Sequence, residues 1–217
     1  MLQEPVPYQR PVVATAAAPA LDGTAARLLD ATAACVARVG VSKTTLDDVA
    51  REAGCSRATL YRYFPGKPAL LGALVGREAQ TLRAALEMAA TGTDSAARCS
   101  LEETVAVVVT RAAGWLAAHP ALQFVIAAEP DLLLPHLAFD GADRVLRAGA
   151  EVFAPSLERF LGADDAQRAG EWLTRLLLSY VSSPAESVDL LDPASVRRLV
   201  ADFVVPGLTS IVDSPRG

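Results

Sequence analysis

Residues 41–68 decide the fold: they read Val-Ser-Lys-Thr-Thr-Leu-Asp-Asp-Val-Ala-Arg-Glu-Ala-Gly-Cys-Ser-Arg-Ala-Thr-Leu-Tyr-Arg-Tyr-Phe-Pro-Gly-Lys-Pro. Four apolar residues in the first half recur at helical spacing: Leu46, Val49, Ala50 and Ala53. Thr44 or Thr45 can cap this helix, because a hydroxyl oxygen there accepts from a free backbone N–H of the first turn. Gly54 supplies the flexible backbone on which a helix ends and the chain turns. The pattern predicts a short helix followed by a tight turn.

A second short helix follows that turn. Ser56 is a good N-cap, and Leu60 and Phe64 share one face at a spacing of four residues. The pair Pro65-Gly66 ends the helix. Two short helices joined by a glycine-containing turn form a helix-turn-helix unit.

The second helix presents side chains that suit a DNA groove. Small residues allow close approach, Arg and Thr can bond base edges, and Tyr hydroxyls can bond phosphate. Lys67 begins the next helix, where an ammonium group and free N–H groups attract phosphate. The residues expected to contact DNA are Thr44, Thr45, Ser56, Arg57, Ala58, Thr59, Tyr61, Arg62, Tyr63 and Lys67.

This stretch resembles the tetracycline-repressor (TetR) family of bacterial transcriptional regulators. The resemblance is dense over about residues 24–76 and weak beyond; Cys55 and Val36 depart from the family pattern on the side away from DNA. The matching features are Gly40, Thr44, Val49-Ala50, Ala53-Gly54, Ser56, Thr59-Leu60-Tyr61, Phe64, Lys67 and Leu70-Leu71. The resemblance implies a DNA-binding domain followed by a second domain that encloses a small-molecule site and forms a four-helix dimer interface.

Charge is divided unevenly along the 217 residues. Residues 1–77 carry nine Lys+Arg against six Asp+Glu, and residues 78–217 carry eleven against nineteen. A net charge of +3 at the front and −8 at the back fits a DNA-binding domain joined to a part that avoids DNA. The total of −5 would by itself argue against a nucleic-acid partner.

Catalytic and metal sites are not expected. The three cysteines and two histidines lack the spacing of a zinc site, and the sequence has no nucleophile-elbow motif. A redox role for Cys55 stays open. We expect no cofactor and no membrane partner, because the longest apolar stretch, 112–139, is interrupted by prolines and charges. A convincing export signal is missing, which predicts a cytoplasmic protein.

The rest of the chain predicts an all-α protein. Residues 1–20 are expected to form a flexible arm, 21–81 the DNA-binding domain, and 82–217 a helical domain for effector binding and dimerisation. The expected helices cover residues 22–39, 44–54, 56–64, 68–91, 100–118, 120–128, 141–162, 164–182 and 193–205. Asp164 or Asp165 is expected to cap the eighth of these helices. The helix 68–91 leaves the DNA-binding domain and is expected to link it mechanically to the second.

Apolar residues between 115 and 160 admit two interpretations, an ordinary helical core or the lining of a cavity for an apolar ligand. The proline-broken run 119–139 favours a cavity, because interrupted helices leave concave surfaces. The expected pocket residues are Trp115, Phe124, Ala127, Phe139, Ala148 and Phe153. With few charges in this cluster, the effector is expected to be largely apolar.

Apolar bands on the last two expected helices are wider than one neighbouring helix would cover, which predicts a homodimer. The expected interface residues are Trp172, Leu173, Leu176, Leu177, Tyr180, Val196, Leu199, Val200 and Phe203. The sequence thus predicts a regulator, foremost a repressor released from a palindromic operator by an apolar effector. A DNA-binding regulator without a ligand, an activator and, more remotely, an enzyme are the alternatives.

Overall fold

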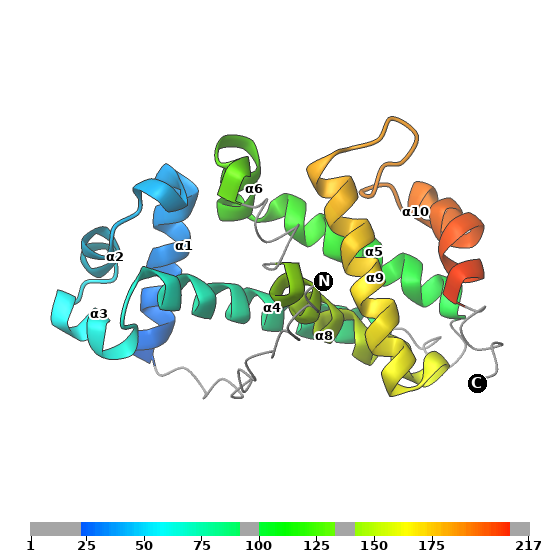
Figure 1. The fold of residues 1–217 in the computed structure, drawn as a ribbon, viewed down its shortest axis with the longest axis horizontal. Coiled ribbons are helices and arrows are strands. Elements are labelled where there is room, and N and C mark those ends of the chain that lie inside the picture. Colours follow the sequence, from blue (N-terminus) through cyan, green and yellow to red (C-terminus); the bar gives the residue numbers. More distant parts are fainter. Residues whose placement is uncertain (1–22, 92–99, 133–141, 209–217) are drawn as a thin grey trace, which may run out of the picture.

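The computed structural model describes residues 23–91, 100–132 and 142–208, and the regular elements there are helical apart from one isolated bridge, Ala185–Val188. Three helices form a small N-terminal unit at one end, and a larger C-terminal body lies at the other (Figure 1). A single long helix, α4 (Lys67–Thr91), runs from one to the other. The all-α prediction is confirmed. The expected N-terminal arm and Phe139 lie outside the described residues.

The N-terminal unit consists of α1 (Gly23–Lys43), α2 (Leu46–Glu52) and α3 (Arg57–Tyr63). Gly40, with φ +84° and ψ 170°, breaks α1 where the sequence predicts its end, and one further turn follows. Thr45 is the N-cap of α2 and forms a capping box with Asp48, whose side chain accepts from the Thr45 N–H. Ser56 caps α3 as predicted.

This unit has a hydrophobic core of its own. Leu60 and Phe64 are buried there, as their spacing predicts, together with Leu70 and Leu74 from the first half of α4. Leu82 and Leu86, further along α4, belong instead to the core of the body. The helix α4 is therefore anchored at both ends, which allows it to transmit a displacement from one core to the other.

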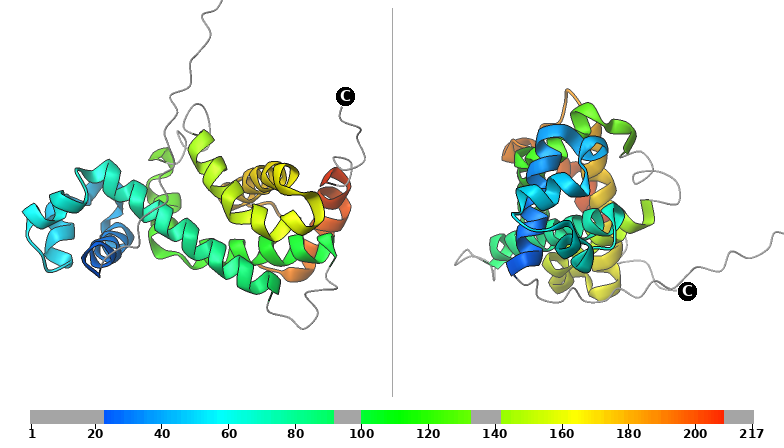
Figure 2. Two further views of the ribbon diagram at one scale, coloured as in Figure 1. Left: turned by 90° about the horizontal axis from the view of Figure 1, so that it is seen from below. Right: turned by 90° about the vertical axis from the view of Figure 1, so that its left-hand side faces the viewer.

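The body is a helical bundle. Besides α4 it contains α5 (Leu101–Ala118), α6 (Pro120–Ala128), η2 (Pro130–Leu132), α8 (Ala142–Leu161), α9 (Ala163–Ser182), α10 (Pro193–Leu199) and the π-helical η4 (Val200–Val204). In a view from below, α4 lies along the bundle and the N-terminal unit projects beyond it (Figure 2).

Most helix starts follow their sequence signals. Ser100 and Glu103 form a capping box at the start of α5, and Asp192 accepts from two backbone N–H groups at the start of α10. The predicted cap of α9 is wrong: Gly162 occupies the N-cap position without a side-chain cap, and Asp164 and Asp165 lie in the first turn. There they still favour the positive end of the helix.

The helices α8 and α9 pack at very close range. A Cβ added at Gly170 of α9 would lie 2.8 Å from the Ala150 carbonyl oxygen of α8, and one at Gly149 would lie 2.2 Å from Thr174 Oγ1. At Gly170 only glycine permits this approach of two backbones, and at Gly149 only glycine leaves room for the Thr174 side chain. This contact fixes α8 against α9 and orients the apolar face of each.

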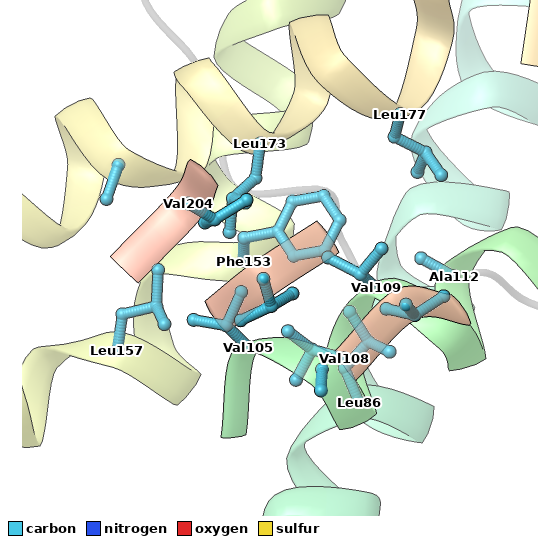
Figure 3. Close-up of a cluster of buried hydrophobic side chains, with 14 of the residues drawn as sticks. Leu86, Val105, Val108, Val109, Ala112, Phe153, Leu157, Leu173, Leu177 and Val204 are labelled. Carbon is cyan, nitrogen blue, oxygen red and sulfur yellow. The ribbon is translucent and has the colours of Figure 1, made fainter. Parts of the chain in front are cut away.

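The core of the body forms where these helices meet α5. Phe153 of α8 lies among Val105, Val109 and Leu173, with Leu177 and Val204 at its edges (Figure 3). All of these side chains are nearly fully buried. The described helices include no single one long and apolar enough to cross a membrane; α5 and α6 together pass that test but are bent by 75° at their junction.

Candidate nucleic-acid interface

The helix α3 lies at the tip of the N-terminal unit, away from the body, in two perpendicular views (Figures 1 and 2). Ser56, Arg57, Ala58, Tyr61 and Arg62 are exposed. Thr59 and Tyr63 are half-buried, since the Thr59 hydroxyl bonds Ser56 and Tyr63 packs on the core of the unit. The structure therefore brings most of the predicted contact residues onto one exposed helix.

The two candidate threonines before α2 differ. Thr45 is exposed, and its hydroxyl both caps α2 and bonds Asp48. Thr44 is buried, and its hydroxyl donates to the Gly40 carbonyl at 2.6 Å. Of the pair, only Thr45 is available to a ligand, which corrects the inclusion of Thr44.

Arg57 bonds two other side chains of this surface. Its Nη1 donates to Asp47 Oδ2 at 3.2 Å, and its Nη2 donates to the Tyr61 hydroxyl at 3.4 Å. Its guanidinium carbon lies 5.5 Å from the centre of the Tyr61 ring, over its face. The Tyr61 hydrogen bond and the Asp47 charge raise the pKa of Arg57 above its ordinary value. The side chain is held in a defined direction although it is exposed.

Lys67 begins α4 as expected from the sequence. Its Nζ donates to the Ser42 carbonyl at 3.3 Å, across from the turn that follows Gly40. The ammonium group is thus tied to the end of α1 while remaining partly exposed. A cation at the start of a helix is a suitable phosphate contact.

The end of α1 also contacts the body. Val36 of α1 is buried against Ala121 and Val125 of α6, and Ala37, Val41 and Leu71 border this small cluster. We call these residues, together with Gly40 and Glu129, the α1–α6 junction. At Gly40 the backbone comes so close to α6 that an added Cβ would lie 2.6 Å from a Phe124 ring carbon.

Glu129, which ends α6, fastens this junction. Its carboxylate accepts from the Val41 N–H at 2.6 Å and from the Ser42 N–H at 2.9 Å. Burial of the carboxyl opposes ionisation, but the hydrogen bonds from Ser42 and Val41 and the Lys67 charge outweigh it and lower the pKa of Glu129. The turn that follows Gly40 is therefore bonded both by Glu129 of the body and by Lys67 at the start of α4.

The predicted pocket residues do not form one lining. Phe153 is part of the packed core, Phe124 lies against Gly40 in the α1–α6 junction, and Ala127 is exposed. Ala148 and Trp115 are half-buried. The assignment of Phe153, Phe124 and Ala127 to a cavity stays a prediction, because the apolar pattern does not distinguish a cavity wall from a core.

Trp115 instead belongs to a mixed apolar and polar contact. Its ring lies 4.9 Å from that of His119, whose Nδ1 accepts from the Leu122 N–H and so caps α6. His119 Nε2 lies 3.4 Å from Glu78 of α4, and the neighbouring Arg77 bonds both Glu78 and Asp30 of α1. This chain of contacts links α1, α4 and the start of α6.

The predicted dimer residues divide into two groups. Five are buried in the core of the same chain and cannot contact a second copy as well: Leu173, Leu177, Val196, Leu199 and Val200. The others remain accessible, with Leu176 and Tyr180 half-buried, Trp172 39% exposed and Phe203 70% exposed. The prediction that these five buried residues form the dimer interface is corrected, since their side chains pack in the core of their own chain rather than facing outward.

Sequence reasoning missed Asp47 and Glu129 as parts of this site. Asp47 lies in the first turn of α2, where an acidic residue is favourable whatever its other contacts, and Glu129 lies 88 residues from its partner Val41. Among the described residues, no group of His, Cys, Asp and Glu gathers as a metal site would.

Comparison with known proteins agrees with this arrangement. Residues 28–74 match the family described as bacterial regulatory proteins, tetR family. The uncharacterized HTH-type transcriptional regulator Rv1255c of Mycobacterium tuberculosis (strain H37Rv) is 32% identical over 187 residues, which are 84% of each chain.

Two solved structures share the fold over most of the chain. The TetR family repressor AlkX from Dietzia sp. strain DQ12-45-1b, implicated in biodegradation of n-alkanes, aligns with a TM-score of 0.64 at 21% identity, covering 86% of this chain and 95% of AlkX. The regulator FadR from Bacillus subtilis, in complex with stearoyl-CoA, aligns with a TM-score of 0.56 at 18% identity, covering 82% and 97%.

Proposed function

Because the chain belongs to the tetR family of DNA-binding transcriptional regulators, a non-enzymatic family, we propose that it is a repressor released from its operator by a largely apolar effector. It acts in the bacterial cytoplasm as a homodimer on palindromic DNA. The observation that carries the proposal is the α1–α6 junction, because through it the body contacts the N-terminal unit directly. A DNA-binding regulator without a ligand and an activator are the alternatives.

The DNA contacts we propose are those of α3 and its surroundings. The N-terminal part of a recognition helix lies nearest the base edges, which gives Arg57 and Ala58 the sequence-reading role. Thr45, Lys67 and the tyrosine hydroxyls are suited to phosphates, which position the protein without reading sequence.

Two substitutions separate these roles. Arg57→Ala is expected to relax the sequence preference at one position of each half-site, costing about 1–3 kcal/mol on the preferred sequence. Lys67→Ala is expected to weaken binding to all duplexes alike. It should also lower the slope of log affinity against log salt concentration by about one phosphate contact. Fluorescence anisotropy with duplexes from upstream of the gene, over a range of salt concentrations, measures both. Wild-type binding by both variants would contradict the assignment of α3.

We propose that the effector binds in the body near Trp115. This side chain is half-buried beside α6, and Pro120–Ala128 contains no charged residue, so the surroundings favour an apolar molecule. The similar proteins AlkX and FadR, implicated in n-alkane degradation and crystallised with stearoyl-CoA respectively, support the same class of compound. His119, which contacts Trp115, lies close enough to meet a polar end group, and Arg77 is linked to His119 through Glu78.

Release follows from the contacts that such a ligand would disturb. A molecule that displaces Trp115 also displaces His119, whose tilted ring contacts it and whose Nδ1 caps α6. A shift of α6 moves Glu129, which holds the two amide groups that follow Gly40. An effector acts only if it binds the shifted arrangement more tightly than the DNA-bound one, and the junction is the element that it would bias.

The effector proposal is tested by thermal unfolding and by operator release. Stearoyl-CoA, a free long-chain fatty acid and a long n-alkane are the probes, and coenzyme A without an acyl chain is the control. At about 100 times its dissociation constant, a true effector should stabilise the protein by about 2.7 kcal/mol and release labelled operator.

Substitution of the proposed contact residue tests where the effector binds. Trp115→Ala is expected to weaken effector binding about tenfold, which is about 1.4 kcal/mol, and to leave operator affinity unchanged. Leu191→Ala, which shortens an exposed apolar residue elsewhere on the body, is the matched control. If no apolar probe acts but the protein still binds its operator, the ligand-free alternative is favoured.

Homodimerisation is proposed through the accessible apolar residues of α9 and of the segment from α10 to η4. Both elements lie at the end of the body away from α3 (Figure 1), which leaves the DNA-binding surface free. Two copies related by a two-fold axis can place their α3 helices in successive major grooves about 34–36 Å apart.

A further inference from the structure

An exposed ion pair joins the two helices of the helix-turn-helix unit. Asp47 of α2 bonds the Nη1 of Arg57 at the first position of α3, and Tyr61, one turn later, bonds the Nη2. The three side chains thus form a single exposed unit at the N-terminal end of α3. We call it the Asp47–Arg57–Tyr61 unit.

This unit is not needed to hold the fold together. Exposed ion pairs add little to stability, because solvent and salt screen them and the side chains lose freedom. The capping of α2 is performed by Thr45 with Asp48, not by Asp47. The position of Asp47 next to the proposed DNA-reading arginine therefore calls for a role at the DNA surface.

The donors left on Arg57 indicate what that role is. Each terminal guanidinium nitrogen carries two hydrogens, and Asp47 and Tyr61 occupy one on each. One donor remains on each nitrogen, which matches the two acceptors, O6 and N7, that guanine presents in the major groove.

The charge of Asp47 acts in the same direction. An arginine free to move can bond any phosphate, which raises affinity for all DNA without reading sequence. A carboxylate bound to the guanidinium repels phosphate. To bond a DNA phosphate, Arg57 must therefore either break its ion pair with Asp47 or bring the Asp47 carboxylate close to that phosphate. Guanine carries no such negative charge.

We propose that Asp47 is a specificity-determining positioning residue that, with Tyr61, holds Arg57 to read a guanine and keeps it from the phosphates. The inference rests on the DNA-reading role of Arg57 given above. It assigns to this chain a guanine in each half-site and an acidic side chain that lowers binding to other DNA.

The experiment is an in vitro selection from a random-sequence duplex library with the full-length protein. Wild type is expected to select a palindrome with a guanine at one fixed position of each arm. Asp47→Ala should lose about fivefold to tenfold of the preference at that position only. It should also bind a scrambled duplex about threefold more tightly, because one negative charge has left the surface. Its melting temperature should stay that of wild type.

Glu52→Ala is the matched control. Glu52 is also an exposed acid of α2, and it pairs with Arg38 at 3.2 Å, the same distance as in the Asp47–Arg57 pair. The control removes the same charge from the same helix and should keep the guanine preference. Asp47→Glu, which retains a carboxylate within reach of Arg57, should restore most of that preference. Arg57→Ala should abolish it, and adding Asp47→Ala to that variant should change it no further.

The outcomes separate this inference from the proposed function. If wild type selects no sequence at all, the DNA-reading assignment of α3 fails. If wild type selects a palindrome and Asp47→Ala selects it with the same base preferences, the role of Asp47 is refuted. A loss of preference spread evenly over the half-site, or an equal effect of Glu52→Ala, would also refute it, because both would reflect charge alone.

Discussion

Phe203→Glu is expected to convert the protein to a monomer whose operator affinity is lower by about 100-fold or more. Phe203 is 70% exposed on the π-helical segment η4, although a phenylalanine side chain gains about 1.5–3 kcal/mol when it is buried. A two-fold symmetric interface contains the same residue from both subunits, so dimerisation would bury two copies of Phe203. A glutamate there would place two unpaired carboxylates in the interface.

The loss of DNA binding follows from the loss of the second copy. One helix-turn-helix unit contacts few base pairs, and linking two units makes the second contact intramolecular. Trp172→Glu on α9, where the tryptophan is 39% exposed, should act in the same direction. Analytical ultracentrifugation at micromolar concentration measures the assembly, and operator anisotropy measures the binding.

Two further variants distinguish an interface from a folding defect. Met88→Glu makes the same kind of change at a residue of α4 that is 72% exposed, and it should leave dimer and operator binding intact. Leu177→Glu should instead unfold the body, because Leu177 is buried beside Phe153 (Figure 3). A wild-type monomer at micromolar concentration, or a dimeric Phe203→Glu variant, would contradict the proposed interface.

The sequence predicts best what neighbouring residues determine. The family resemblance is confirmed, and the caps formed by Ser56, Ser100 and Asp192 lie where the sequence indicates them. A cap bonds an N–H two or three residues away, so its signal is complete within one short stretch. At Asp164 and Asp165 the same signal fails because Gly162 already begins the helix.

Apolar periodicity predicts which residues are covered but not what covers them. Leu173 and Leu177 lie on the same helix as Trp172, and all three fit an apolar band. The close approach of Gly170 to the α8 backbone turns Leu173 and Leu177 into the core of their own chain and leaves Trp172 partly exposed. The same limit applies to Phe153, where a core position and a cavity wall have the same sequence signal.

A single sequence carries no signal for contacts between residues that lie far apart along the chain. Glu129 ends α6 beside Pro130 and resembles an ordinary helix-terminal residue, yet it binds the amide groups of Val41 and Ser42. Gly40 was predicted only to end a helix, whereas it also permits Phe124 and Glu129 to reach the backbone. The coupling of the two parts of the molecule thus depends on residues that local patterns did not identify.

Gly40→Ala tests that junction, and we expect it to destabilise the protein by about 3 kcal/mol. Gly40 has φ +84° and ψ 170°, a conformation that is essentially restricted to glycine and costs other residues about 1–3 kcal/mol. The added Cβ would also lie 2.6 Å from Phe124 Cε1 and 2.7 Å from Glu129 Oε2, and such overpacking typically costs about 1–3 kcal/mol more. Urea unfolding, followed by circular dichroism, measures the difference.

Gly54→Ala separates backbone strain from the contact with α6. Gly54 also has a positive φ, +66°, but nothing lies within 4 Å of the position of its Cβ, so only strain of about 1–2 kcal/mol is expected. Glu129→Gln removes one of the two carboxylate acceptors and should cost about 1–3 kcal/mol, because one of the two amides loses its partner.

The double variants then show whether Gly40 and Glu129 act together. Gly40→Ala combined with Glu129→Gln should be less destabilised than the sum of the two, since Glu129 is one of the groups that the new methyl displaces. Gly54→Ala combined with Glu129→Gln should be additive, because these residues share no contact. Gly40→Ala should also uncouple effector binding from operator release, whereas Gly54→Ala should keep it. Equal losses of stability in the two glycine variants, with an unchanged effector response in both, would show that the junction does not transmit the signal.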